Sequence, residues 1–161
     1  MSVKLKRLAA AAAIVIVAAV AVILWLNPHG QRLVLTDSGS GKVYASYPVS
    51  DGDTFSVTFI HSVNKTPVSD VYEVRGGSII LTGTVYYSFG AGVPDELAEG
   101  EKLSIREDGA MVITGMDKNL DGVVYAVGTV SDHVLELGGE EISLRDLCGR
   151  NSKVRFEIRG R

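Results

Sequence analysis

A dense set of polar side chains follows a segment of alternating residues at 54–60. His61, Ser62, Thr66 and Asp70 supply an imidazole, two hydroxyls and a carboxylate. An imidazole donates or accepts a hydrogen bond near neutral pH, and a carboxylate orients it or binds a cation. We therefore expect these side chains to line a recognition site for a small ligand. The alternative is an ordinary turn whose hydroxyls satisfy the loop backbone.

A pair of glycines forms the second group of interest. Gly90 and Gly92 flank one alanine and precede Pro94. They lack the third glycine and the following helix of a dinucleotide fingerprint, so a phosphate cradle is not expected. Such glycines let another backbone or a ligand approach closely. We place Gly90 and Gly92 at the same predicted site as His61, together with His133.

A third group resembles the first half of a calcium loop. Asp117, Asn119 and Asp121 place oxygen ligands at alternate positions, and Gly122 follows them. The twelfth position of this segment is Gly128 rather than Glu, which excludes a strong helix–loop–helix site. An irregular, weak calcium site and an ordinary Asp/Asn/Gly turn remain the alternatives. No other cofactor is expected.

Hydrolase chemistry needs a nucleophile, a base and an acid. Ser62 could supply the nucleophile, His61 or His133 the base, and Asp70 or Asp132 the acid. However, adjacent His61 and Ser62 on one strand would point to opposite faces, and no nucleophile elbow is present. The two histidines could share a metal only if the fold brings them together, and no third ligand stands out. The sequence therefore favours a binding module over an enzyme.

Short runs of period two, bounded by Gly, Asp, Asn or Ser, position these groups. The sequence predicts an all-β domain, a single β-sandwich or small barrel, with hairpin turns at 76–77 and 138–139. Helix should be nearly absent outside the N-terminal segment, apart from one turn near 94–98. The expected strands are 32–36, 42–47, 54–60, 71–75, 78–82, 84–89, 102–106, 111–114, 123–127, 133–137, 141–144 and 153–159.

An apolar segment precedes this domain. Residues 8–26 contain 19 residues without a charge, Pro or Gly, and at 1.5 Å per residue they extend about 28 Å, enough to cross a bilayer core. Three basic residues lie in the tail at 1–7, and by the positive-inside rule this tail is cytoplasmic. We interpret 8–26 as an uncleaved signal anchor, with a cleaved signal peptide as the alternative. The domain at 27–161 is then extracytoplasmic and tethered to the cell membrane.

The composition of the domain limits the classes of partner that we expect. The domain carries 13 basic and 19 acidic residues, a net charge of −6, which argues against nucleic acid and against adhesion to anionic lipid. The lipid bilayer is expected to contact only residues 8–26. Cys148 is the only cysteine, so the domain has no intramolecular disulfide and must be stable through its core alone.

Three motifs resemble a known family when they are taken in order. These are His61-Ser62-Val63 with Thr66-Pro67-Val68, then Ser88-Phe89-Gly90-Ala91-Gly92 with Pro94, then Asp132-His133 with Leu135. They resemble a domain-of-unknown-function family of small membrane-anchored or exported prokaryotic proteins, often encoded beside TAXI-type TRAP transporters. The resemblance implies a binding or accessory module near organic-acid uptake, with transporter subunits or a small organic acid as partners. A structural or interaction domain is the alternative function, followed by a small hydrolase.

Overall fold

The computed structural model describes residues 30–88 and 96–160, and the described residues from Gln31 onward form one compact unit. Within the described residues, eleven strands and one short helix follow in chain order: β1 (Arg32–Asp37), β2 (Val43–Pro48), β3 (Thr54–Ile60), β4 (Pro67–Arg75), β5 (Ser78–Tyr86), β6 (Lys102–Ile105), β7 (Met111–Asn119), β8 (Val124–Ala126), β9 (His133–Leu137), β10 (Glu140–Ser143), α2 (Leu144–Cys148) and β11 (Lys153–Arg159).

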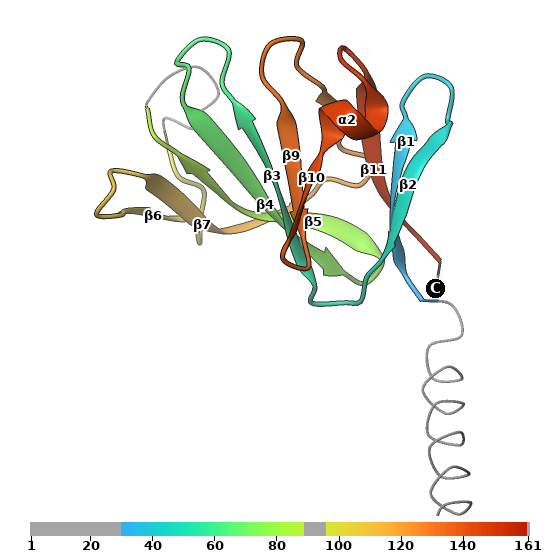
Figure 1. Cartoon of the computed structure of the whole chain (residues 1–161). Coiled ribbons are helices and arrows are strands. Elements are labelled where there is room, and N and C mark those ends of the chain that lie inside the picture. The colour runs from blue at the N-terminus through green and yellow to red at the C-terminus, as the bar shows by residue number, and fades with distance from the viewer. Residues whose placement is uncertain (1–29, 89–95, 161) are drawn as a thin grey trace, which may run out of the picture. The chain divides into compact units, whose positions relative to one another are not determined.

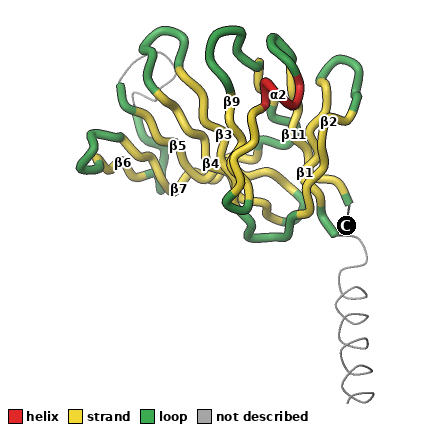
Figure 2. The backbone as a smooth tube through the Cα atoms, in the orientation of Figure 1, coloured by secondary structure: helices red, strands yellow, loops and turns green. Residues whose placement is uncertain are grey.

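The strands form two sheets (Figures 1 and 2). Every strand pair within these sheets is antiparallel. The smaller sheet has the order β2-β1-β11-β8, and the larger one has the order β10-β9-β3-β4-β5-β7-β6. In the larger sheet, β3 lies between β4 and β9, although β9 is far away in the sequence. This register places the end of β3 beside the start of β9.

Side chains from both sheets share one core. Leu35 and Phe156 of the smaller sheet are buried together with Phe55 and Tyr72 of the larger sheet. The Phe55 ring stacks on Tyr72 with centroids 5.0 Å apart and on Phe156 with centroids 6.2 Å apart. Two antiparallel sheets that bury facing side chains make a β-sandwich-like fold, so the all-β prediction is confirmed.

Most of the predicted strands are present, but several elements differ. β7 was predicted as 111–114 and extends from Met111 to Asn119, so it includes Asp117 and Asn119 of the predicted calcium loop. Residues 78–82 and 84–89 were predicted as two strands, but β5 runs without a break from Ser78 to Tyr86 and accommodates a register shift at Gly83. β4 begins at Pro67, earlier than predicted. The helix α2 was not predicted. The predicted turn near 94–98 lies partly outside the described residues, and 96–98 are not helical.

No helix within the described residues is long and apolar enough to cross a membrane. The membrane segment predicted at 8–26 lies outside those residues.

Candidate functional site

A cleft of about 590 Å³ lies between the loop that follows β3 and the loop that precedes β9. Both loops are at the same end of the domain because β3 and β9 are antiparallel neighbours (Figure 1). The cleft therefore joins residues that are about seventy positions apart in sequence. Its lining residues are Phe59, Ile60, His61, Ser62, Lys65, Ala126, Gly128, Thr129, Val130, Ser131 and His133.

The loop after β3 closes on His61. The backbone N–H of His61 donates to the Thr66 carbonyl at 2.9 Å, and the Lys65 N–H donates to the His61 carbonyl at 2.9 Å. The His61 Nδ1 atom accepts the N–H groups of Val63 at 3.3 Å and Asn64 at 3.4 Å. The imidazole thus takes the part that Asn or Asp plays in many turns. The same residue lines the cleft.

The second wall of the cleft is held from three directions. The Arg145 guanidinium donates from Nη2 to the Val130 carbonyl at 3.0 Å. Val127 N–H donates to the Ser152 carbonyl at 2.8 Å, and Gly128 N–H donates to His133 Nδ1 at 3.3 Å. These bonds tie the loop to α2, to the segment before β11 and to the start of β9. The wall is thus built by the fold rather than by the loop alone.

His133 forms the floor of the cleft against aromatic rings. Its imidazole stacks on Phe59 with centroids 5.2 Å apart and makes a T-shaped contact with the Tyr125 ring, with centroids 5.9 Å apart. Burial lowers the pKa of His133 below its ordinary value of 6.5, with nearby Asp132 opposing the shift and Arg145 adding to it. Burial disfavours the charged form of an imidazole, so the environment of His133 favours the neutral ring.

The charge of the cleft is opposite to that of the domain. Lys65 is the only charged residue among the described residues that line it, and none of them is Asp or Glu. The neighbouring Asp132 carboxylate turns instead toward α2, where it accepts the Ser143 hydroxyl and the Arg145 N–H. Burial alone would raise the pKa of Asp132, but these hydrogen bonds outweigh it and keep the pKa below the ordinary value.

Asp70 lies in the interior of the sandwich rather than among the residues that line the cleft. Its carboxylate accepts the Tyr125 hydroxyl at 2.8 Å and the Thr84 hydroxyl at 3.1 Å. The Tyr125 hydroxyl is also hydrogen-bonded to the Tyr72 hydroxyl. Burial raises the pKa of Asp70, and both hydroxyl donors oppose that shift. Tyr125 thereby contacts the partly buried carboxylate with its hydroxyl and His133 with its ring.

The structure brings some of the predicted site residues together and separates others. His61, Ser62 and His133 line one cleft. Thr66 contributes its carbonyl to the loop, and it does not line the cleft. Gly90 and Gly92 lie outside the described residues.

Two features of the cleft differ from the sequence-based expectations. β3 ends at Ile60, so His61 and Ser62 do not alternate across a strand, and both face the cleft. Sequence reasoning also missed Lys65 and the 128–131 segment. Lys65 has a φ of 58°, which is uncommon for a residue other than Gly. The polar residues on both sides of Lys65, Asn64 and Thr66, were the feature of the sequence that indicated a loop here.

The residues of the candidate calcium loop have protein partners. Asp117 accepts the Arg75 guanidinium at 2.7 Å, and Asn119 Oδ1 accepts the Asp121 N–H at 3.0 Å. Asp121 accepts the Ser78 hydroxyl and the Ile79 N–H. Within the described parts of the chain, no three His, Cys, Asp or Glu side chains are grouped as a metal site requires.

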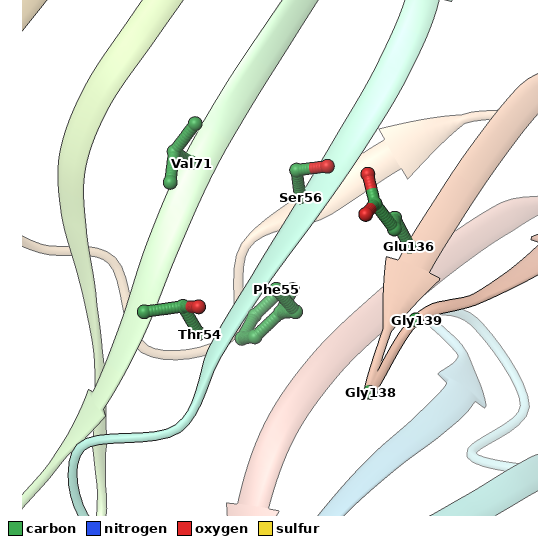
Figure 3. Close-up of a pocket in the computed structure, with 7 residues that line it drawn as sticks. All are labelled: Thr54, Phe55, Ser56, Val71, Glu136, Gly138 and Gly139. Atoms are coloured by element: carbon green, nitrogen blue, oxygen red, sulfur yellow. The ribbon is translucent and has the colours of Figure 1, made fainter.

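A second hollow, of about 380 Å³, lies over β3, β4 and the β9–β10 turn (Figure 3). Thr54, Ser56 and Glu136 supply its polar groups, and Val71 supplies an apolar one. Thr54 and Ser56 belong to the face of β3 opposite to buried Phe55. This hollow has one carboxylate and no imidazole, so it lacks the convergent donors of the first cleft.

Comparison with known proteins gives one match. A family model described as a domain of unknown function (DUF1850) matches residues 55–144, which is more than half of the 161-residue chain. No curated protein and no solved structure matches it. The matched range contains all the residues that line the cleft.

Proposed function

We propose that this chain, which belongs to the DUF1850 family of domains of unknown function, is an extracytoplasmic binding module that takes a small organic acid in the cleft between His61 and His133. The observation that carries the proposal is the chemistry of that cleft. In an acidic domain, its lining combines two imidazoles, one ammonium group and three hydroxyls with no carboxylate. Such a set of donors favours a ligand that accepts hydrogen bonds and carries negative charge.

The proposal also includes attachment of the domain to the membrane and an accessory role for a transporter. The apolar segment 8–26 with basic residues on one flank supports a tether that leaves the domain outside the cytoplasm. The likeness of three motifs to proteins encoded beside TAXI-type TRAP transporters supports an accessory role in organic-acid uptake.

The rim of the cleft supports contact with a partner protein. Ile60 ends β3 and is 37% exposed, while Val63 and Val130 lie on the two loops that form the cleft and are 70% and 88% exposed. Apolar side chains gathered beside a ligand site are typical of surfaces that a partner covers. We propose that a transporter subunit contacts this rim.

The first test follows uptake in cells. His61→Ala removes an imidazole that accepts two backbone N–H groups of an exposed loop, so we expect the free energy of unfolding to fall by no more than about 1.5 kcal/mol. Uptake of labelled organic acids should fall to the level of cells that lack the chain. Lys102→Met, on the distant edge strand β6, is the matched control and should behave as the wild type. Normal uptake with a large loss of stability would remove the functional role of His61.

The second test addresses location and partners. Protease added to cells whose outer barrier is open should digest the domain, because the positive-inside rule places it outside. Complete protection of the domain from the protease would mean that its orientation is the reverse of the one proposed. Affinity purification from native membranes should recover transporter subunits with the wild type and fewer with Val130→Ser. Recovery of no transporter subunit would exclude the accessory role.

A further inference from the structure

We infer that the cleft is specific for a monocarboxylate with an apolar body, and that the imidazoles of His61 and His133 each donate an Nε2–H to its carboxylate. The inference rests on the proposed function and defines the chemistry of recognition within it. It follows from the protonation state that the backbone imposes on both rings, from the charge of the cleft and from its apolar wall.

The backbone determines which nitrogen of each ring carries the proton. Nδ1 of His133 accepts the Gly128 N–H, and Nδ1 of His61 accepts the N–H groups of Val63 and Asn64. A backbone N–H can only donate, so both Nδ1 atoms must present a lone pair. A neutral imidazole with a lone pair at Nδ1 carries its proton at Nε2. Both rings therefore offer an N–H donor and no acceptor to a ligand.

This protonation state excludes a ligand class that two histidines would otherwise suggest. An imidazole that binds a metal through Nε2 needs its lone pair there, and it usually donates the other N–H to a carbonyl or carboxylate. Here the hydrogen bonds at Nδ1 of His61 and His133 run in the opposite direction. A transition-metal ion would have to break them, whereas a carboxylate oxygen accepts both Nε2–H groups as they stand.

The charge and the walls of the cleft limit the rest of the ligand. Lys65 is the single cation among the described lining residues, and burial disfavours the charged form of His133. One positive charge matches one carboxylate. Phe59, Ile60 and Val130 line the same space and provide apolar contact area. A small acid with one carboxylate and an aliphatic or aromatic body satisfies both features.

The ring protonation can be measured without any ligand. Nitrogen-15 NMR of the full chain in mild detergent, labelled at histidine, distinguishes a protonated from an unprotonated ring nitrogen. Signals are assigned with His61→Asn and His133→Phe, which retain a turn-capping acceptor and an aromatic stack, respectively. We expect an unprotonated Nδ1 and a protonated Nε2 for both residues. A proton on Nδ1 of either ring overturns the inference, while the proposed function would stand.

The ligand class is tested with three defined probes and zinc ion. Hexanoate should shift both Nε2 signals, hexanamide should not, and succinate should bind more weakly than hexanoate. His61→Asn and His133→Phe should each weaken hexanoate binding about tenfold, with Lys102→Met unchanged. Any of four results would overturn the inference. These are tighter binding of succinate than of hexanoate, equal binding of hexanamide and hexanoate, absence of hexanoate binding, and saturable zinc binding at both rings. None of these results depends on the transporter measurements.

Discussion

His133 in β9 stacks on Phe59, its cross-strand partner in β3, with centroids 5.2 Å apart and ring planes inclined by 12°. The stack buries one face of the imidazole at the point where the cleft begins. Because water cannot solvate that face, the charged form of the ring is disfavoured. The same contact that positions His133 at the cleft therefore lowers the pKa of its imidazole.

The first prediction is a stability loss at mildly acidic pH. Because burial lowers the pKa of His133 in the folded protein, the unfolded chain binds more protons below its ordinary pKa of 6.5. The free energy of unfolding is therefore highest, with respect to this residue, above pH 6.5. It decreases as the pH falls toward the pKa of His133 in the folded protein. Urea unfolding of the full chain at a series of pH values measures this slope.

His133→Phe, which keeps an aromatic ring on Phe59, provides the comparison. It should flatten the part of the pH profile that belongs to His133. The raised pKa of Asp70 acts with the opposite sign, because the unfolded chain loses its proton first as pH rises above the ordinary value of 3.8. A His133→Phe profile as steep as that of the wild type would show that the imidazole is not kept neutral by the fold.

Local pattern was sufficient to predict most of the sheet but not the cleft. Phe55, Val57 and Phe59 alternate with hydroxyl residues, and this alternation determines which face of β3 is buried whatever its neighbours are. The adjacency of β3 and β9 is a non-local property, since more than seventy residues separate the two strands. His61 and His133 could be nominated from the sequence, but their shared cleft depended on this pairing.

Asp70 illustrates what the residue pattern alone leaves open. A carboxylate beside Ser69 in a polar stretch is typical of an exposed ligand group, whereas in the fold it accepts a hydroxyl from Tyr125, 55 positions away. That tyrosine belongs to β8 of the smaller sheet, whereas Asp70 belongs to β4 of the larger sheet. The helix α2 was missed for a related reason, because five residues capped by Ser143 carry too little periodicity to identify.

The second prediction concerns the buried hydroxyl of Tyr125. Tyr125→Phe removes the donor to Asp70 and the partner of the Tyr72 hydroxyl. The Asp70 carboxylate then retains the Thr84 hydroxyl but loses its other hydroxyl donor, and the Tyr72 hydroxyl loses this partner. The loss should cost about 1–3 kcal/mol of the free energy of unfolding. Tyr87→Phe is the control, because its hydroxyl bonds to Asp108 at the surface and its loss should cost under about 0.5 kcal/mol. Equal effects in chemical denaturation would contradict a buried network.

The third prediction is slow modification of Cys148. Burial, followed by the nearby charge of Asp37, raises the pKa of its thiol from 9.0 to about 11. The thiolate is the reactive form, so below pH 9 its population should be about a hundredfold smaller than in an unfolded chain. Iodoacetamide should therefore label native protein much more slowly than protein in urea. Comparable rates in the two states would mean that the thiol is exposed at the end of α2.

The last prediction uses a glycine to alter the cleft without changing its polar groups. A Cβ added at Gly128 would overlap the carbonyl oxygen of Ser131, and a backbone atom cannot swing away as a side chain does. Gly128→Ala should therefore force the 128–131 segment outward and lengthen the hydrogen bond from residue 128 to His133 Nδ1. The strain should cost about 1–3 kcal/mol, as overpacking usually does. Hexanoate binding should weaken even though every ligand-contacting side chain is present.

Gly39→Ala serves as the matched substitution, because a Cβ at this exposed turn makes only an ordinary contact with the Asp37 carboxylate. It should leave both stability and hexanoate binding at wild-type values. The NMR signal of His133 supplies the decisive comparison, because loss of the residue 128 donor frees Nδ1 and permits the alternative protonation state. If Gly128→Ala retains the wild-type nitrogen shifts and full hexanoate affinity, this loop does not control the protonation of His133.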